Sequence, residues 1–230
     1  GRSSRFDESG HEPILKGNMV EQALHTRELD FGGKEFTFHQ QSDGMLGTTV
    51  WDPSLVLAAY VARHPQMFRD KRLIELGAGV GVPGVVAAAL TNPRELITTD
   101  FLDPVLDILR MNVETNGVQA KVEKLDWKDK EARESLGRFQ VILAAAVVYG
   151  GATVNARWRH DGLVDCMLDL AEEDATILLA YEQFHEVDCE FFDVAAAAGL
   201  EFSQIPEDQQ DPQWCSPDLP LYIMRKRSAT

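Results

Sequence analysis

Cysteine is scarce in this sequence, and the three cysteines present, Cys166, Cys189 and Cys215, lie far apart. They form no C-x-x-C pair and have no clustered histidines beside them, so the sequence predicts neither a disulfide framework nor a metal site. The six histidines are scattered, and none has a serine, cysteine or acid at a spacing typical of a catalytic triad. A hydrolase of the triad type is therefore not expected.

Positive charge is also scarce, because 22 lysines and arginines stand against 37 aspartates and glutamates, for a net charge of −15. Nucleic-acid phosphates are normally bound by a concentrated basic patch, and the short basic cluster MRKR near the C-terminal end is a poor substitute for one. No nucleic-acid partner is expected. The acidity itself has two explanations, a basic partner or simply solubility.

Long apolar runs are absent as well. No run approaches the roughly 20 residues that span a bilayer, and the N-terminal stretch GRSSRFDESGHEP lacks the hydrophobic segment of a signal peptide. We therefore expect no membrane partner and a cytoplasmic location, with the nucleus as the alternative.

The composition that remains is that of an ordinary globular protein, with 44% hydrophobic and 26% charged residues. A chain of 230 residues has the size of one substantial domain. Residues 1–20 are polar and without periodicity, so we expect a flexible N-terminal extension followed by a single domain over residues 21–230, acting as a monomer.

The N-terminal half opens with two local signals. The stretch TRELDFGGKEFTFHQQ alternates apolar and polar residues on both sides of Gly32-Gly33, which predicts a β-hairpin over residues 26–40. From Asp52 to His64, the stretch DPSLVLAAYVARH predicts a helix with Asp52 as N-cap and Pro53 at the first helical position.

After this helix, short apolar runs alternate with helical patterns. Strands are predicted at 72–76, 95–100, 121–126, 139–146 and 176–181, and helices start at Pro83, Pro104, Leu163 and Glu186. This alternation predicts parallel strands with helices on both faces. The last two strands, LEFSQI and LPLYIMRK, are joined by a polar loop without a helix, so they are expected to pair antiparallel. The predicted fold is a Rossmann-like α/β sheet of five parallel strands plus a terminal antiparallel pair.

A glycine-rich run, IELGAGVG at residues 74–81, follows the first parallel strand. With Gly84 it fits the dinucleotide pattern G-x-G-x-x-G, and from Glu75 it also fits the acidic-x-G-x-G-x-G pattern of enzymes that use S-adenosylmethionine (SAM). The antiparallel ending favours a SAM-dependent methyltransferase, because a dinucleotide-binding half continues as strand, helix, strand. The chain also has no room for a separate dehydrogenase substrate domain.

Ligands of an open parallel sheet bind beyond the carboxyl ends of its strands, where this loop is expected. Glu75 is predicted to face the methionine ammonium group, with a solvated carboxylate as the alternative. Asp100 is predicted to accept from the ribose hydroxyls and Asp126 from the adenine amino group. Trp127 would supply an apolar wall and Trp51 would close over the cofactor, and core packing is the alternative for both indoles.

Five segments of the chain, GTTVWDPSLVLAAYV, IELGAGVGVPGVVAA, TTDF, LDW and AAAVVYG, together resemble the seven-strand protein methyltransferases of the methyltransferase-like 21 group. The resemblance covers about residues 26–227. That group modifies lysines on chaperones and translation elongation factors, so the resemblance implies a SAM-dependent protein-lysine N-methyltransferase that releases S-adenosylhomocysteine and takes a protein substrate with a basic or lysine-bearing segment. It also implies seven cofactor-binding positions: Trp51, Gly77, Ala78, Gly79, Asp100, Trp127 and Ala145.

The chain departs from this group at one position. The group carries D-x-x-Y after its fourth parallel strand, whereas residues 146–149 are Ala-Val-Val-Tyr, so Tyr149 is kept and Ala146 replaces the acid. Three explanations are open: an engineered inactive variant, a natural pseudoenzyme that serves as a binding module, or a different acceptor such as histidine. Glu182, at the end of the fifth strand, is a candidate substitute acid, with a solvated carboxylate as the alternative.

Overall fold

The computed structural model describes residues 24–41, 45–149, 156–182 and 190–227. Its centre is a seven-stranded sheet with the order β5-β4-β3-β6-β7-β9-β8. The first five strands in this order are parallel, and β9 runs antiparallel to both of its neighbours. This confirms the predicted sheet. The strands are β3 (Arg72–Leu76), β4 (Glu95–Asp100), β5 (Lys121–Lys124), β6 (Phe139–Ala145), β7 (Ala171–Ala180), β8 (Leu200–Gln204) and β9 (Leu221–Lys226).

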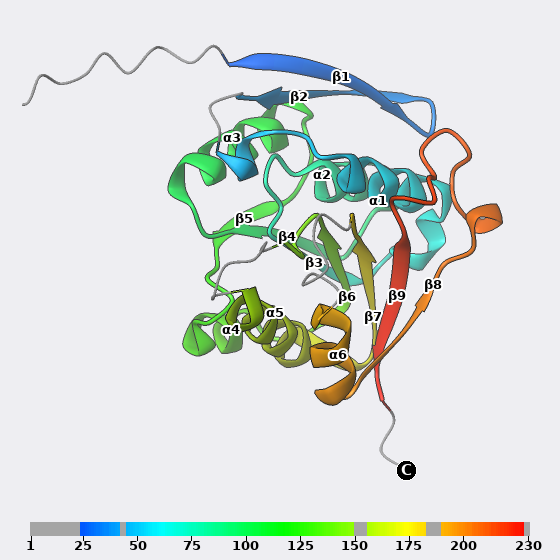
Figure 1. Cartoon of the computed structure of the whole chain (residues 1–230). Helices are drawn as coiled ribbons and strands as arrows, with labels where there is room; N and C mark the ends of the chain where they lie inside the picture. Colours follow the sequence, from blue (N-terminus) through cyan, green and yellow to red (C-terminus); the bar gives the residue numbers. More distant parts are fainter. Residues whose placement is uncertain (1–23, 42–44, 150–155, 183–189, 228–230) are drawn as a thin grey trace, which may run out of the picture.

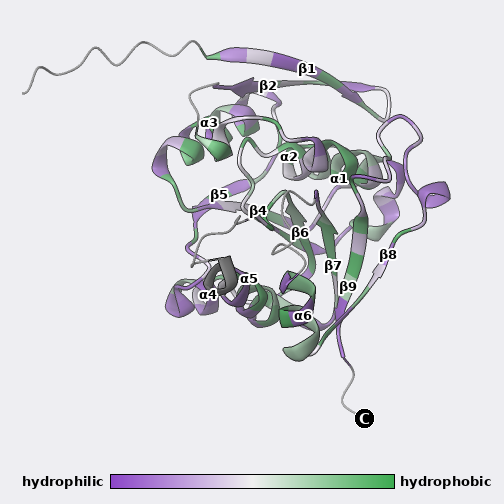
Figure 2. Cartoon of the chain, viewed as in Figure 1, coloured by the Kyte–Doolittle hydropathy of each residue, from purple (hydrophilic) through white to green (hydrophobic). Residues whose placement is uncertain are grey.

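Helices cover both faces of the sheet (Figure 1). One layer holds α1 (Asp52–Arg63), α2 (Val82–Thr91) and α3 (Asp103–Thr115), and the other holds α4 (Lys130–Leu136), α5 (Ala156–Leu170) and α6 (Glu190–Ala197). Successive side chains of a strand point to opposite faces, so Leu73 joins the core under α1 and α2 whereas Ile74 joins the core on the other side. Figure 2 shows the hydrophobic residues concentrated along the central strands β6 and β7. None of the helices in the described part is long and apolar enough to cross a membrane.

The predicted hairpin is confirmed as β1 (His25–Phe31) and β2 (Lys34–Gln40), which pair antiparallel. Gly32 and Gly33 have φ values of 63° and 79°, a region that glycine enters without steric penalty, and the Gly33 N–H donates to Asp30 Oδ1. The hairpin lies over the layer formed by α1, α2 and α3 (Figure 1). Its inward side chains, among them Phe36 and Phe38, are buried in the core of that layer.

Three helices differ from the prediction. In α1 the N-cap is Trp51 and Asp52 is the first helical residue, so the predicted cap is wrong by one position. α4 was not predicted, because its seven residues, KEARESL, carry no apolar stripe; the Asp129 side chain caps its start by accepting from the Ala132 N–H. α5 begins at Ala156, seven residues before the predicted start, and residue 171 already belongs to β7.

Two predictions fall partly or wholly outside the described residues. The predicted extension over residues 1–20 lies outside them, and so do residues 186–189 of the helix predicted to start at Glu186, of which α6 is the described part. The short 3-10 helices η1 (Leu46–Thr48), η2 (Pro65–Met67) and η4 (Glu207–Gln209) complete the described elements.

Candidate active site

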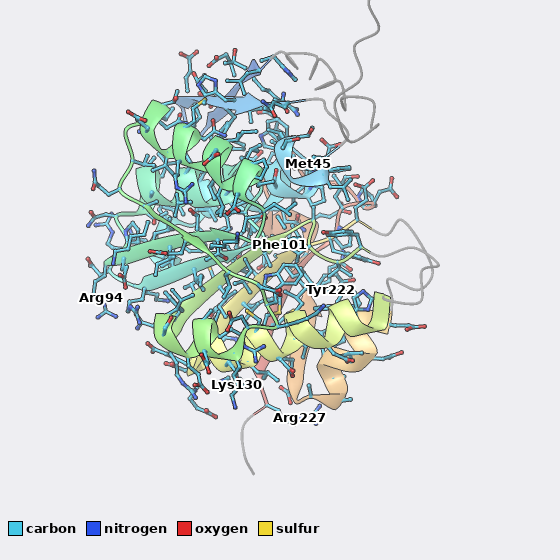
Figure 3. All side chains as sticks on the ribbon, turned by 90° about the vertical axis from the view of Figure 1, so that its left-hand side faces the viewer. Met45, Arg94, Phe101, Lys130, Tyr222 and Arg227 are labelled. Carbon is cyan, nitrogen blue, oxygen red and sulfur yellow. The ribbon has the colours of Figure 1, made fainter. Side chains whose placement is uncertain are left out.

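The register of the sheet brings the predicted strand-end residues to one edge. Leu76 of β3 pairs with Thr99 of β4 and with Ala144 of β6, so the residues that follow these strands emerge side by side. The strand order reverses between β3 and β6, which is where open α/β sheets bind ligands. In Figure 3, β4 runs from Arg94 at the left margin to Phe101 near the centre, and the carboxyl ends lie on the side of Phe101.

The glycine loop has a backbone that only glycine suits. Gly77, Gly79 and Gly81 have φ values of 61°, 55° and 86°. Space is short as well, since a Cβ at Gly77 would lie 2.8 Å from Val147 Cγ1 and 3.1 Å from Trp127 Cζ2. The loop is tied to the neighbouring strand by the Ala78 N–H, which donates to the Thr99 carbonyl at 2.8 Å.

Asp100 ends β4 and is joined to this loop. Its Oδ2 accepts from the Gly79 N–H at 3.1 Å, while Oδ1 accepts from the N–H groups of Phe101 at 2.8 Å and Leu102 at 3.4 Å. Burial raises the pKa of Asp100, and the three N–H groups oppose that shift. A carboxylate has about four acceptor sites, so this oriented group retains capacity for a ligand hydroxyl.

Glu75 lies deeper than predicted. It is 2% exposed, its Oε2 has no hydrogen-bond partner among the described residues, and a Cβ at Gly84 in α2 would overlap this oxygen. Burial is the main cause that raises the pKa of Glu75 to about 8, with a smaller opposing effect of the Gly84 amide and a small upward effect of Asp100. The alternative of a solvated carboxylate is wrong, and the contact with the methionine ammonium group stays a prediction.

Trp127 and Asp126 follow β5 and differ in their surroundings. Trp127 is half-buried, and its indole lies next to Gly77. The backbone carbonyl of Trp127 accepts from Arg133 Nη1 at 2.6 Å. Arg133 is itself buried and forms an ion pair with Asp169 at 3.1 Å. Asp126 is exposed, and its Oδ1 accepts from the Lys128 N–H. The structure therefore brings Trp127 to the glycine loop, and the adenine contact of Asp126 stays a prediction.

Trp51 is connected to the glycine loop by η1, a short 3-10 helix that was not predicted. Its Nε1 donates to the Leu46 carbonyl at 2.7 Å, and the neighbouring Gly47 carbonyl lies 3.1 Å from the position of a Cβ at Gly79. The turn η1 therefore connects Trp51 to the glycine loop. No local pattern in the sequence indicated this role.

Phe101 was also missed as a site residue. It follows Asp100 directly, and 51% of this large apolar residue is exposed. The sequence Asp100-Phe101 could have indicated this position, because a residue that directly follows a strand-end acid lies at the same edge of the sheet.

Ala145, which was predicted to bind the cofactor, and Ala146 and Tyr149, which were predicted at the acceptor, lie at the end of β6 and just beyond it. Ala145 is the last residue of β6, and Ala146 follows with a φ of 55° while its N–H donates to the Ala180 carbonyl at 3.1 Å. Among non-glycine residues this left-handed region favours asparagine and aspartate. Tyr149 is half-buried. The backbone at residue 146 therefore suits the acid that the sequence lacks.

Carboxylates gather beside β7 at the same end of the sheet. Burial is the main cause that raises the pKa of Glu182, and the charges of Asp52 and Asp218 raise it further. These three acids come from the start of α1, the end of β7 and the loop before β9. Sequence reasoning had named Glu182 alone, because the other two join it only in the folded chain.

Comparison with known proteins places these residues in a family. Residues 31–198 match the family described as lysine methyltransferase. The chain is 35% identical over 100 residues to calmodulin-lysine N-methyltransferase of Arabidopsis thaliana, which covers 41% of this chain and 33% of that protein. It is 34% identical over 123 residues to the protein-lysine N-methyltransferase EEF2KMT of Mus musculus, covering 47% of this chain and 36% of that protein.

Longer but weaker matches extend over most of the chain. The protein N-terminal and lysine N-methyltransferase efm7 of Schizosaccharomyces pombe is 24% identical over 212 residues, covering 84% of this chain and 80% of that protein. Among solved structures, the 16S rRNA methyltransferase RsmC of T. thermophilus aligns with a TM-score of 0.65 at 18% identity, over 89% of this chain and 51% of that chain. The structural likeness supports the fold alone. Since the family match covers well over half of the sequence, the chain belongs to the lysine methyltransferase family.

Proposed function

We propose that this protein is a SAM-dependent protein N-methyltransferase that methylates a lysine side chain. The observation that carries the proposal is the hydrogen bond from the Gly79 N–H to Asp100 Oδ2, because it joins the glycine loop and the strand-end acid into one site at the switch point of the sheet. Membership of the lysine methyltransferase family supports the same reaction. The chain spans only 33% and 36% of two of the curated relatives that it matches, so activity and substrate are proposals.

The residues present fit the cofactor. Asp100 is oriented by backbone N–H groups and can accept from ribose hydroxyls. Left-handed glycines let the backbone approach a ligand closely, and the N-terminus of α2 carries partial positive charge that can attract a carboxylate. Trp127 beside Gly77 can exclude water from one side of the site. When bound, SAM supplies a methyl group on a positively charged sulfur.

The acceptor end of the site suits a cationic side chain. Asp52, Glu182 and Asp218 place negative charge at the carboxyl end of β7, and the chain as a whole has a net charge of −15. Such a field attracts lysine and steers its approach. Methyl transfer then needs a neutral amine aligned with the methyl group, and Tyr149 is the residue of this chain that we assign to the acceptor.

We infer that Ala146 limits the activity of this chain. An aligning carboxylate at this position would contribute on the order of 2 to 4 kcal/mol, hence roughly a hundredfold in rate. The left-handed backbone at Ala146 supports replacement of an aspartate in an otherwise intact site. The missing acid also motivates the second candidate function, a non-catalytic module that keeps the cofactor fold and binds a basic partner. A third explanation for alanine at position 146 is that the acceptor side chain is histidine and not lysine.

Titration calorimetry tests the cofactor assignment. We expect S-adenosylhomocysteine to bind with one site per chain and NADH to give no heat. Binding of NADH without binding of S-adenosylhomocysteine would show that the glycine motif binds a dinucleotide instead.

The substrate class follows from the relatives. One relative is named calmodulin-lysine N-methyltransferase and another is named protein-lysine N-methyltransferase EEF2KMT. The resemblance noted above adds chaperones and translation elongation factors, so we propose a protein substrate of this kind with an accessible lysine. We also propose a monomer that works in the cytoplasm or nucleus without nucleic acid. Free thiols at Cys166 and Cys215 support a reducing compartment.

A further inference from the structure

Two asparagines at the C-terminal end of α3, Asn112 within the helix and Asn116 as its C-cap, hydrogen-bond the hairpin. Asn112 and Asn116 lie one helical turn apart, on the same side of α3. Asn116 accepts from the Thr37 N–H at 3.1 Å and donates to the Thr37 carbonyl at 2.8 Å. Asn112 does the same with His39, accepting at 2.7 Å and donating at 3.0 Å.

The two side-chain amides together imitate a neighbouring strand. Four helical residues rise about 6 Å, and two strand residues span about 6.8 Å, so amides at positions 112 and 116 match alternate residues of β2. Each satisfies one N–H and one carbonyl on the edge of β2 that faces α3 (Figure 1). The hairpin is thereby fixed in register against the helix.

Asn112 makes its third hydrogen bond to the glycine loop, whereas the third bond of Asn116 goes to the Asn112 carbonyl. Asn112 Nδ2 donates to the Val80 carbonyl at 2.9 Å, and the residue is fully buried. Val80 stands between Gly79 and Gly81, which both have left-handed backbone. A single side chain therefore contacts β2 of the hairpin and the centre of the glycine loop.

The surrounding packing strengthens this connection. Leu109, one turn earlier on α3, fills the space that a Cβ at Gly81 would need. The C-terminal end of β2 is also bonded to the segment before α1. The Val50 N–H donates to Gln40 Oε1, and the Gln41 N–H donates to the Thr48 carbonyl. These bonds fix the segment that carries Trp51 and Gly47.

We propose that Asn112 is a positioning residue for the cofactor loop and that the N-terminal hairpin acts through it to set cofactor affinity. The effect on cofactor affinity rests on the proposed function. The effect of Asn112 on the conformation of the glycine loop does not, because it concerns the loop without a ligand. Without the amide of Asn112, the Val80 carbonyl would lose its buried donor and the loop would relax from the geometry that Gly79 needs for its bond to Asp100.

The test compares two identical changes one turn apart. Asn112→Asp keeps the size of the side chain and its acceptor for the His39 N–H, but removes the donor to the Val80 and His39 carbonyls. Asn116→Asp makes the same chemical change where the side chain, among the described residues, hydrogen-bonds only Thr37 and the Asn112 carbonyl. By calorimetry we expect Asn112→Asp to weaken S-adenosylhomocysteine binding about tenfold or more, and Asn116→Asp to change it less than about threefold. Both are expected to lower the melting temperature.

A second readout separates this inference from the proposed function. Hydrogen exchange of the Gly79, Val80 and Gly81 amides, measured without ligand, is expected to be faster in Asn112→Asp than in Asn116→Asp. If the parent chain binds no S-adenosylhomocysteine, the proposed function fails and exchange alone decides the role of Asn112. Should Asn112→Asp not fold, Asn112→Ala carries the same comparison. Equal affinity and equal loop exchange in the two variants would overturn the inference and leave Asn112 a structural residue.

Discussion

At the scale of single residues, Asp100 connects sequence, fold and chemistry most directly. It is the last residue of a buried parallel strand, and its carboxylate is already oriented by three backbone N–H groups. A ligand therefore meets an acceptor that needs little rearrangement, which is the physical basis of preorganised binding.

Exchanging this carboxylate for an amide tests its role. In Asp100→Asn one oxygen becomes an NH₂ group that faces either a backbone donor or the ligand hydroxyls, so we expect S-adenosylhomocysteine to bind at least about tenfold more weakly by calorimetry. Asp103→Asn is the matched control, because Asp103 is exposed and, in the described part of the chain, pairs only with Lys124 at 2.7 Å. Equal losses in the two variants would contradict the assignment.

The raised pKa of Glu75 predicts that the stability of the fold depends on pH. Its pKa is raised from 4.5 to about 8 in the folded chain, so between these values the folded state holds a proton that the unfolded state releases. The sign follows: stability that is present below about pH 4.5 is lost as the pH rises toward 8.

Glu75→Gln removes this group from the titration. We expect the variant to gain stability relative to the parent as the pH rises from about 5 to about 8, by an amount on the order of a few kcal/mol. Urea unfolding at both pH values measures the difference. A difference between variant and parent that stays constant with pH would show that Glu75 does not titrate in this way.

Residue positions at strand ends could be predicted from the sequence, whereas contacts across the fold could not. Gly77, Gly79, Asp100 and Trp127 follow short apolar runs, and parallel strands bring such positions together. Asn112 has no local signal, since its partner His39 is 73 residues away. The burial of Glu75 depends on α2 lying over β3, which periodicity alone does not reveal.

At the scale of elements, segments with an apolar period were predictable and polar ones were not. The hairpin, α1, α2 and α3 carry buried faces that the sequence pattern indicates. α4 and the first turns of α5 are polar, so only capping signals such as Asp129 and Gly137 mark α4. The start of α5 at Ala156 carries no such mark.

Helix α2 supplies a prediction at this scale. Gly84 lets α2 approach β3, because a Cβ there would lie 2.5 Å from Thr98 Cγ2 and would overlap Glu75. Gly84→Ala is expected to lower the free energy of unfolding by about 1 to 3 kcal/mol. Gly162→Ala in α5 is the control, since its nearest neighbour is the flexible side chain of Lys128, and alanine there is expected to be neutral or stabilising. Urea unfolding of both variants provides the measurement, and equal effects would contradict the close approach of α2.

At the scale of the whole molecule, the ending of the chain decides the class of fold. Its polar loop and lack of a final crossover helix predicted an antiparallel pair, and β8 and β9 form it. The insertion of β9 between β7 and β8 was not predicted, because strand order depends on packing against both helical layers. The same fold brings acids from three distant segments together beside β7, where we propose that a cationic substrate approaches.

The central claim is that this chain has a methyltransferase site from which one carboxylate is missing. Its most direct test is transfer of radiolabelled methyl from SAM to proteins of a lysate by Ala146→Asp, followed by mass spectrometry of the labelled residues, with the double variant Ala146→Asp, Asp100→Asn as the control. We expect Ala146→Asp to label lysine roughly a hundredfold faster than the parent chain and the double variant to fall back toward the parent. Absence of labelling by Ala146→Asp while S-adenosylhomocysteine still binds would contradict the central claim and identify the fold as a non-catalytic binding module.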